Sequence, residues 1–178
     1  MPRITLVLLF ACALPLSGQS TTPAAAAPRS NAEFARRAWR EVHGHLVQAA
    51  TSAPESLFAF RPTPEVRSFG EMLDHVAASE RGYCQMALGE RPTAGGAGTG
   101  ARTRAEILAA LLGAAEICER AHGQHDVDLD RPAFGGGRAS RLHVLLENAM
   151  HDTEHYGNVV TYLRLRGMVP PSSQPAPR

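Results

Sequence analysis

Four stretches of the chain carry apolar residues at the three- and four-residue spacing of an amphipathic helix. They cover about residues 31–51, 69–88, 104–122 and 140–166. No stretch of the sequence shows a convincing alternation of apolar and polar residues, which is the pattern of a half-buried β-strand. Four helices of this length predict an all-α protein, a four-helix bundle in which each helix turns its apolar stripe inward.

The apolar stripe of each stretch identifies the residues that we expect in the core. Ala and Leu dominate these positions, and aromatic residues make up only 6% of the chain. Small and straight-chain apolar side chains suit helix packing better than a β-sandwich core. The expected inward residues are Phe34, Ala38, Val42 and Leu46, then Phe69, Met72, Leu73, Val76 and Tyr83, then Ile107, Leu108, Leu111, Leu112 and Ala115, and finally Leu142, Leu145, Leu146, Ala149 and Met150.

Three of the four stretches begin with a capping-box pattern, in which Ser or Thr is followed three residues later by Glu. The hydroxyl accepts a hydrogen bond from the backbone N–H three residues on, and the Glu carboxylate accepts from the N–H of the cap residue. Each pattern therefore predicts a helix start. The pairs are Ser30 with Glu33, Ser68 with Glu71, and Thr103 with Glu106.

The last stretch ends with a helix C-terminal signature. Arg164 and Arg166 place positive charge in the final turn, at the negative end of the helix dipole. Gly167 follows, and Pro170 and Pro171 cannot continue a helix. We therefore expect this helix to end near residue 166.

Two cysteines indicate how the second and third helices run relative to each other. Cys84 lies 16 residues after Ser68, and Cys118 lies 15 residues after Thr103. In antiparallel helices these thiols would lie roughly 20 Å apart, whereas in parallel helices they lie at nearly the same height. The connection over residues 89–102 can span ~46 Å when extended, enough to return along a helix. We predict a Cys84–Cys118 disulfide between parallel helices, with two unrelated buried thiols as the alternative.

The N-terminus has the features of a secretory signal peptide. Arg3 forms a minimal positive region, and the apolar stretch over residues 4–16 is followed by small and polar residues. We expect cleavage near Ser20, and lipid attachment at Cys12 is the less favoured alternative. The expected mature protein is exported, periplasmic or extracellular, and an even number of cysteines then remains in an oxidising compartment.

The expected division of the chain is a signal peptide over residues 1–20, a tether over 21–30, the bundle over 31–173 and a tail over 174–178. The signal stretch is too short to span a bilayer as a mature helix, and no other stretch is apolar enough to do so. The net charge is +1, with acidic and basic residues interspersed. No basic patch stands out, which argues against a nucleic-acid partner.

His151 and His155 lie four residues apart, about one helical turn, so both imidazoles project from one face of the last helix. His75 is on the expected inward face of the second helix and is the best third partner. Three histidines leave a metal with an open position, which suits a catalytic or ligand-binding ion. The pattern is not the metalloprotease motif, because Asp152 stands where that motif has Glu. Taken singly, the other histidines are expected to be surface or hydrogen-bonded residues: His43, His45, His122, His125 and His143.

Two segments resemble a known family. Residues 151–172, which begin His-Asp-Thr-Glu-His-Tyr-Gly-Asn, resemble the last helix of the DinB/YfiT-like family. Residues 68–77, Ser-Phe-Gly-Glu-Met-Leu-Asp-His-Val-Ala, resemble the second helix of that family. The similarity covers about residues 34–173, in the order and spacing of the family.

The resemblance implies an up-down-down-up four-helix bundle, which agrees with the parallel helices predicted from the cysteines. It also implies a divalent transition metal, commonly zinc or nickel, held by His75, His151 and His155. Characterised relatives include transferases and isomerases that use low-molecular-weight thiols, and dimers are common. Those thiol-using relatives are cytoplasmic, so the export signal of this chain counts against thiol transfer.

The leading hypothesis is a metal-dependent hydrolase or transferase that acts on a small molecule, with a water activated at the open metal position. The alternative is a non-catalytic, stress-related bundle protein that binds a metal or a small ligand. A third interpretation treats the three histidines as core residues. No catalytic side chain is assigned by these patterns.

Four further residues have candidate roles around the site. Asp152 and Glu154 could accept hydrogen bonds from imidazole N–H groups, although their place beside the histidines favours a solvated helix face. Glu80, five residues after His75, is a weaker candidate to approach the site. Arg164 could bind an anionic substrate, but an interaction with the helix C-terminus is favoured.

Overall fold

The computed structural model describes residues 30–93, 102–135 and 137–175. Within these ranges the chain is helical and has no named strand, with one isolated bridge between Pro132 and Ser140. The elements are α1 (Asn31–Ser52), α2 (Glu55–Phe58), α3 (Phe69–Leu88), α4 (Arg104–His122), α5 (Asp126–Leu129), α6 (Arg141–Leu165) and the short 3₁₀ helix η1 (Pro171–Ser173).

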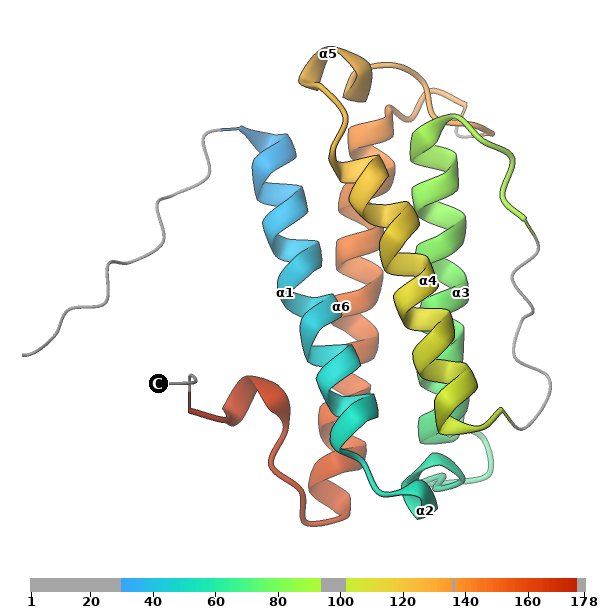
Figure 1. Cartoon of the computed structure of the whole chain (residues 1–178), viewed down its shortest axis with the longest axis vertical. Helices are drawn as coiled ribbons and strands as arrows, with labels where there is room; N and C mark the ends of the chain where they lie inside the picture. Colours follow the sequence, from blue (N-terminus) through green and yellow to red (C-terminus); the bar gives the residue numbers. More distant parts are fainter. Residues whose placement is uncertain (1–29, 94–101, 136, 176–178) are drawn as a thin grey trace, which may run out of the picture.

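The four long helices form the predicted bundle with up-down-down-up connectivity. Figure 1 shows α1 and α6 running in one direction and α3 and α4 in the other. Helix α3 packs against α4 and α6, while α1 packs against α6 and α4, so α1 and α3 lie diagonally opposite. The crossover between the parallel helices α3 and α4 passes through residues 94–101, which lie outside the described ranges.

The helix ends follow the local signals in the sequence. Complete capping boxes form at the starts of α3 and α4, and the Ser30 hydroxyl accepts from the Glu33 N–H at 3.2 Å. At the end of α6, the N–H of Gly167 donates to the carbonyl of Arg164, and the N–H of Met168 donates to Leu163. Gly167 has a φ of 72°, a conformation that costs glycine little. This Schellman arrangement confirms the predicted stop.

The rotation of three helices about their axes differs from the prediction. Phe34, Leu112 and Met150 were expected inside, yet they are 48%, 54% and 71% exposed. In α1 the buried stripe is instead centred on Ala35 and Trp39. In α6 the buried stripe includes polar residues, among them Asn148 and Asp152. A search for apolar periodicity passes over these residues and therefore places the centre of the stripe too close to Met150. The buried residues of α6 are Val144, Leu145, Asn148, Ala149, Asp152, Tyr156, Val159, Tyr162 and Leu163.

The predicted disulfide joins Cys84 on α3 to Cys118 on α4, with Cα atoms 5.0 Å apart. Because α3 and α4 run in parallel, residues at similar heights along the two helices face each other. The bridge closes a loop of 34 residues, which corresponds to a stabilisation of roughly 3–4 kcal/mol on the chain-entropy description. The disulfide therefore ties together the two helices whose connection is a long crossover.

The expected signal peptide, the Cys12 lipid alternative and most of the tether lie outside the described residues. None of the described helices is both long and apolar enough to cross a membrane. The expected connections also contain short helices, because α2 lies in the segment between α1 and α3 and α5 lies between α4 and α6.

Candidate metal centre

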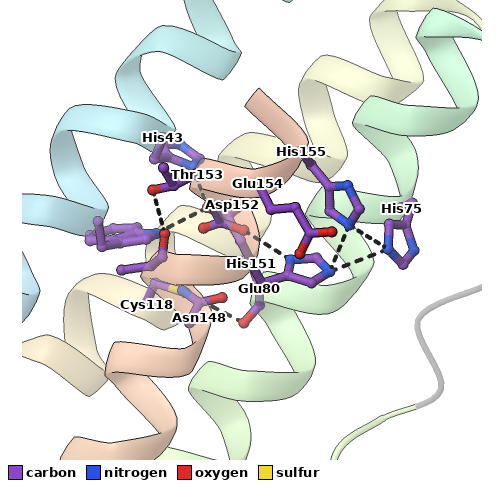
Figure 2. Close-up of polar contacts among 12 residues, drawn as sticks. His43, His75, Glu80, Cys118, Asn148, His151, Asp152, Thr153, Glu154 and His155 are labelled. Carbon is purple, nitrogen blue, oxygen red and sulfur yellow. Dashed lines mark hydrogen bonds and ion pairs between the residues drawn. The ribbon is translucent and has the colours of Figure 1, made fainter. Parts of the chain in front are cut away.

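The structure brings together the three histidines singled out from the sequence. His75 extends from α3, and His151 and His155 extend from successive turns of α6 (Figure 2). The Nε2 atoms form a nearly equilateral triangle. The His75–His155, His75–His151 and His151–His155 Nε2 distances are 3.2, 3.3 and 3.1 Å. No other group of three or more His, Cys, Asp or Glu side chains with this spacing occurs among the described residues.

This triangle has the dimensions of a tetrahedral metal site. Imidazole nitrogens at about 2.05 Å from tetrahedral zinc lie about 3.3 Å from one another. Hydrogen bonding accounts for the geometry poorly, because three neutral Nε2 atoms that all face one point cannot each find a donor there. A cation in front of the triangle would accept all three lone pairs. The donor set and its spacing therefore fit a divalent transition metal.

The electrostatics of the site keep its imidazoles neutral. Burial lowers the pKa of His75 and His155, and burial together with its two histidine neighbours lowers the pKa of His151 to about 4. The positive charge of Arg67 lowers the pKa of each of the three rings further. Because a metal binds the neutral imidazole, the three rings are in the ligating form at neutral pH.

Asp152 is not on a solvated face, contrary to the favoured expectation. Its side chain is fully buried, and its Oδ1 lies 3.4 Å from the Nδ1 of His151. A carboxylate at this position can accept from Nδ1–H and leave Nε2 free to face the triangle. Burial, with the charge of Glu80 next, raises the pKa of the Asp152 carboxyl well above its ordinary range. Glu154, by contrast, is exposed as expected.

Glu80 approaches the centre only indirectly. It is fully buried in the bundle, where its Oε1 accepts from the indole N–H of Trp39 at 3.0 Å and lies 2.8 Å from Nδ1 of His43, both on α1. Arg164 lies on the exposed side of α6, where its Nη2 is 3.5 Å from the Ser173 hydroxyl. The position of Arg164 gives no support for substrate binding at the metal centre.

Two residues beside the triad were not assigned to the site from the sequence. The ring of Tyr83, expected only as a core residue, lies 5.7 Å from that of His151. Arg67 directly precedes the Ser68 cap of α3, and its backbone carbonyl accepts from the Tyr162 hydroxyl at 2.8 Å. Helical spacing could have indicated Tyr83, two turns after His75, but no local pattern indicates where an arginine outside the helix points.

The five remaining histidines do not join the triad. His43 contacts Glu80, His45 stacks on a tyrosine of α6, and His143 pairs with a glutamate one turn later. His122 is buried and stacks on Trp39. His125 is exposed before α5.

Comparison with known proteins identifies the family. Residues 34–159 match the family description of the DinB superfamily. This chain belongs to the DinB superfamily. The match spans most of the bundle and includes all three histidines of the triad. A comparison of this DinB protein with curated proteins gave no significant match.

Proposed function

We propose that this DinB protein is a divalent-metal-dependent hydrolase or transferase acting on a small molecule, with His75, His151 and His155 as the metal ligands. The observation that carries the proposal is the triangle of Nε2 atoms, 3.1–3.3 Å on each side, on three half-buried rings. Three protein ligands leave a position for water or substrate, as in catalytic rather than structural metal sites. Zinc or nickel is the proposed metal, because imidazole nitrogen suits both.

The residues around the triad can assist such a reaction. A bound metal would supply Lewis acidity, which polarises a substrate oxygen or acidifies a water. The exposed carboxylate of Glu154 acts electrostatically on His155 and is the candidate to hold a proton on the solvent side. Arg67 acts electrostatically on all three rings, and its guanidinium favours an anionic group beside the metal.

An exported location is part of the proposal. The N-terminal pattern of a signal peptide and the Cys84–Cys118 disulfide both fit an oxidising compartment. A reduced low-molecular-weight thiol is scarce in such a compartment, so hydrolysis or transfer to another acceptor is favoured over thiol transfer. Mass analysis of the secreted protein tests the cleavage, because a mature chain that begins near residue 21 is the expected product.

Metal analysis of the purified protein is the decisive experiment. The wild type should hold about one zinc or nickel per chain, and His75→Ala and His155→Ala should hold none. His143→Ala is the matched control, because His143 lies on the same helix, is exposed and contacts Glu147 rather than the triad. A wild-type protein that purifies without metal, and whose melting temperature ignores added zinc and nickel, would overturn the proposal.

The competing function is non-catalytic binding of a metal or small ligand. One observation favours it: within the described part of the chain, the carboxylate that contacts the triad is Asp152, on the buried side. Screening of the metal-loaded protein against esters, amides and small electrophiles separates the two functions. Turnover that His155→Ala abolishes supports the enzyme, whereas stoichiometric metal without turnover supports the binding protein.

A further inference from the structure

A second pocket lies away from the metal centre, between α2 and the first turns of α3 and α4. Its volume is about 460 Å³, and it is at the end of the bundle where Figure 1 places α2. Pockets that hold small ligands typically measure about 300–1,000 Å³. None of the three triad histidines lines this pocket. It is therefore a separate candidate site for a small molecule.

The walls of the pocket are held together by contacts between its elements. Nη2 of Arg61, in the segment after α2, donates to both carboxylate oxygens of Glu71 on α3, at 2.8 and 2.7 Å. Arg104, in the first turn of α4, donates to the carbonyl of Ala53 just before α2 at 2.9 Å. Because these contacts join α2 and its flanks to both long helices, the shape of the pocket is set before a ligand binds.

Asp74 is the buried polar group of this pocket. Its side chain is only 3% exposed, and its Oδ1 accepts from Nη1 of Arg102. Its Oδ2 is buried and has no partner in the described part of the chain, unlike every other buried side-chain oxygen or nitrogen of the lining residues. A buried acceptor without a donor is costly, and a ligand that supplies the donor recovers that cost.

Arg102 lies on the solvent side of Asp74, because the arginine side chain is 42% exposed. Arg102 precedes the Thr103 cap of α4, so it is outside the helix. Partly exposed side chains change rotamer within nanoseconds, so this guanidinium can turn aside without movement of a helix. Its contact with Asp74 also shows that this carboxylate accepts a planar cationic donor, and only one of the two oxygens is used in this way.

We propose that this pocket binds a small organic cation, an amidinium, guanidinium or ammonium group on an apolar body, with the cationic group hydrogen-bonded to Asp74. A charged N–H donor makes a stronger hydrogen bond to a carboxylate than a neutral donor does. The apolar body would lie against Phe58 and Ile107, which also line the pocket. The proposal goes beyond the metal-dependent function, since it needs neither the triad nor a metal.

The charges of the lining favour a cation over an anion. Three carboxylates and two guanidinium groups line the pocket. Both guanidinium groups already contact carboxylates, Arg61 with Glu71 and Arg102 with Asp74. Glu55 is 67% exposed and approaches its nearest arginine only to 3.6 Å, so its carboxylate adds negative charge at the pocket mouth. An anionic ligand would have to displace one of these ion pairs.

NMR titration of the nitrogen-15-labelled protein at pH 7 tests the proposal, with benzamidine as the probe. Benzamide and benzoate are the neutral and anionic molecules of nearly the same shape. Benzamidine should bind with a Kd of about 1 mM or tighter and shift the amide signals of Gly70 and Thr103. Benzamide and benzoate should bind roughly tenfold more weakly or not at all.

Two variants locate the probe in the pocket. Asp74→Asn should weaken benzamidine binding roughly 10- to 100-fold, because the charged acceptor is lost. Glu116→Gln, on the exposed side of α4, is the matched control and should bind as wild type does. Ala59→Trp fills the pocket from an exposed position on its wall and keeps Asp74, so it gives the answer even if Asp74→Asn fails to fold. Circular dichroism checks the fold of each variant.

The outcomes separate this pocket from the metal centre. Failure of benzamidine to bind, or unchanged binding in a folded Asp74→Asn or Ala59→Trp variant, overturns the proposal. Benzamide or benzoate binding as tightly as benzamidine overturns the cationic class of the ligand. His155→Ala should bind benzamidine as wild type does, and loss of binding there would mean that the probe occupies the triad instead. A wild type that binds benzamidine but no metal overturns only the metal-dependent function.

Discussion

The imidazole of His122 stacks on the indole of Trp39, with ring centroids 4.9 Å apart and planes inclined by 15°. His122 is 1% exposed, and neither ring nitrogen has a hydrogen-bond partner in the described part of the chain. Burial, with the charge of Arg36 second, lowers its pKa from 6.5 to about 4. Between pH 6.5 and 4, the folded protein therefore keeps this ring neutral, whereas the unfolded chain binds a proton on it.

This relationship predicts an acid-sensitive contribution to stability. Between pH 6.5 and 4 the unfolded state binds more protons at His122, so stability falls as the pH falls through this window. The full effect is about 3 kcal/mol at 1.36 kcal/mol per pKa unit. His122→Phe, which can keep the stack on Trp39, should remove this part of the dependence. Denaturant unfolding of metal-free protein at pH 7 and pH 5 should show about 2 kcal/mol of this loss, because pH 5 still lies above the folded pKa. A His122→Phe variant that loses as much stability between the two pH values as the wild type would contradict the assignment.

Loss of the disulfide should destabilise the bundle without disassembling the metal site. Cys84→Ala combined with Cys118→Ala should lower the free energy of unfolding by roughly 3–4 kcal/mol, because the unfolded chain regains the freedom of the open loop. Metal stoichiometry at 20 °C should stay near that of wild type, because His75, His151 and His155 lie on the α3–α6 contact rather than the α3–α4 contact. Thermal melts of the double variant, beside wild type with and without reductant, provide the check.

Removal of the charge of Arg67 should strengthen metal binding at alkaline pH. The guanidinium repels a dication held by the triad, and at pH 8 the imidazoles are neutral with or without it. Arg67→Gln should therefore raise zinc affinity by roughly threefold to tenfold at low ionic strength. Arg164→Gln is the control, because Arg164 lies elsewhere on α6 and should leave the affinity unchanged. Equal zinc affinities in wild type and Arg67→Gln would show that the charge of Arg67 does not act on the bound metal.

The rotation of α4 predicts that substitution of one of two adjacent leucines lowers stability strongly, whereas substitution of the other has little effect. Leu111 is fully buried and Leu112 is 54% exposed. Leu111→Ala should cost about 2–5 kcal/mol, as for other buried leucines, whereas Leu112→Ala should change stability by less than about 0.5 kcal/mol. Urea unfolding of the two variants measures the difference. Comparable losses would mean that both leucines pack inside, as the apolar pattern alone predicts.

Local signals in the sequence determined where the long helices begin and end. Ser68, Thr103 and Gly167 satisfy backbone groups within a few residues of themselves, so the capping patterns and the C-terminal glycine need no tertiary information. The spacing of His151 and His155 likewise follows from helical geometry alone. The cysteines predicted parallel helices because distance along a helix is proportional to residue number.

Only the tertiary structure decided which way each helix is rotated and what its polar residues meet. Phe34, Leu112 and Met150 are exposed because the rotation of a helix minimises the exposure of the whole bundle, not of one stripe. Asp152 is polar, so periodicity places it at the surface, and only the packing of α6 against α1 and α3 buries its carboxyl group beside His151. Hydrogen bonds within a helix join residues that are close in sequence, so they can be predicted from the local sequence. Contacts between side chains 70 or more residues apart depend on how the helices pack.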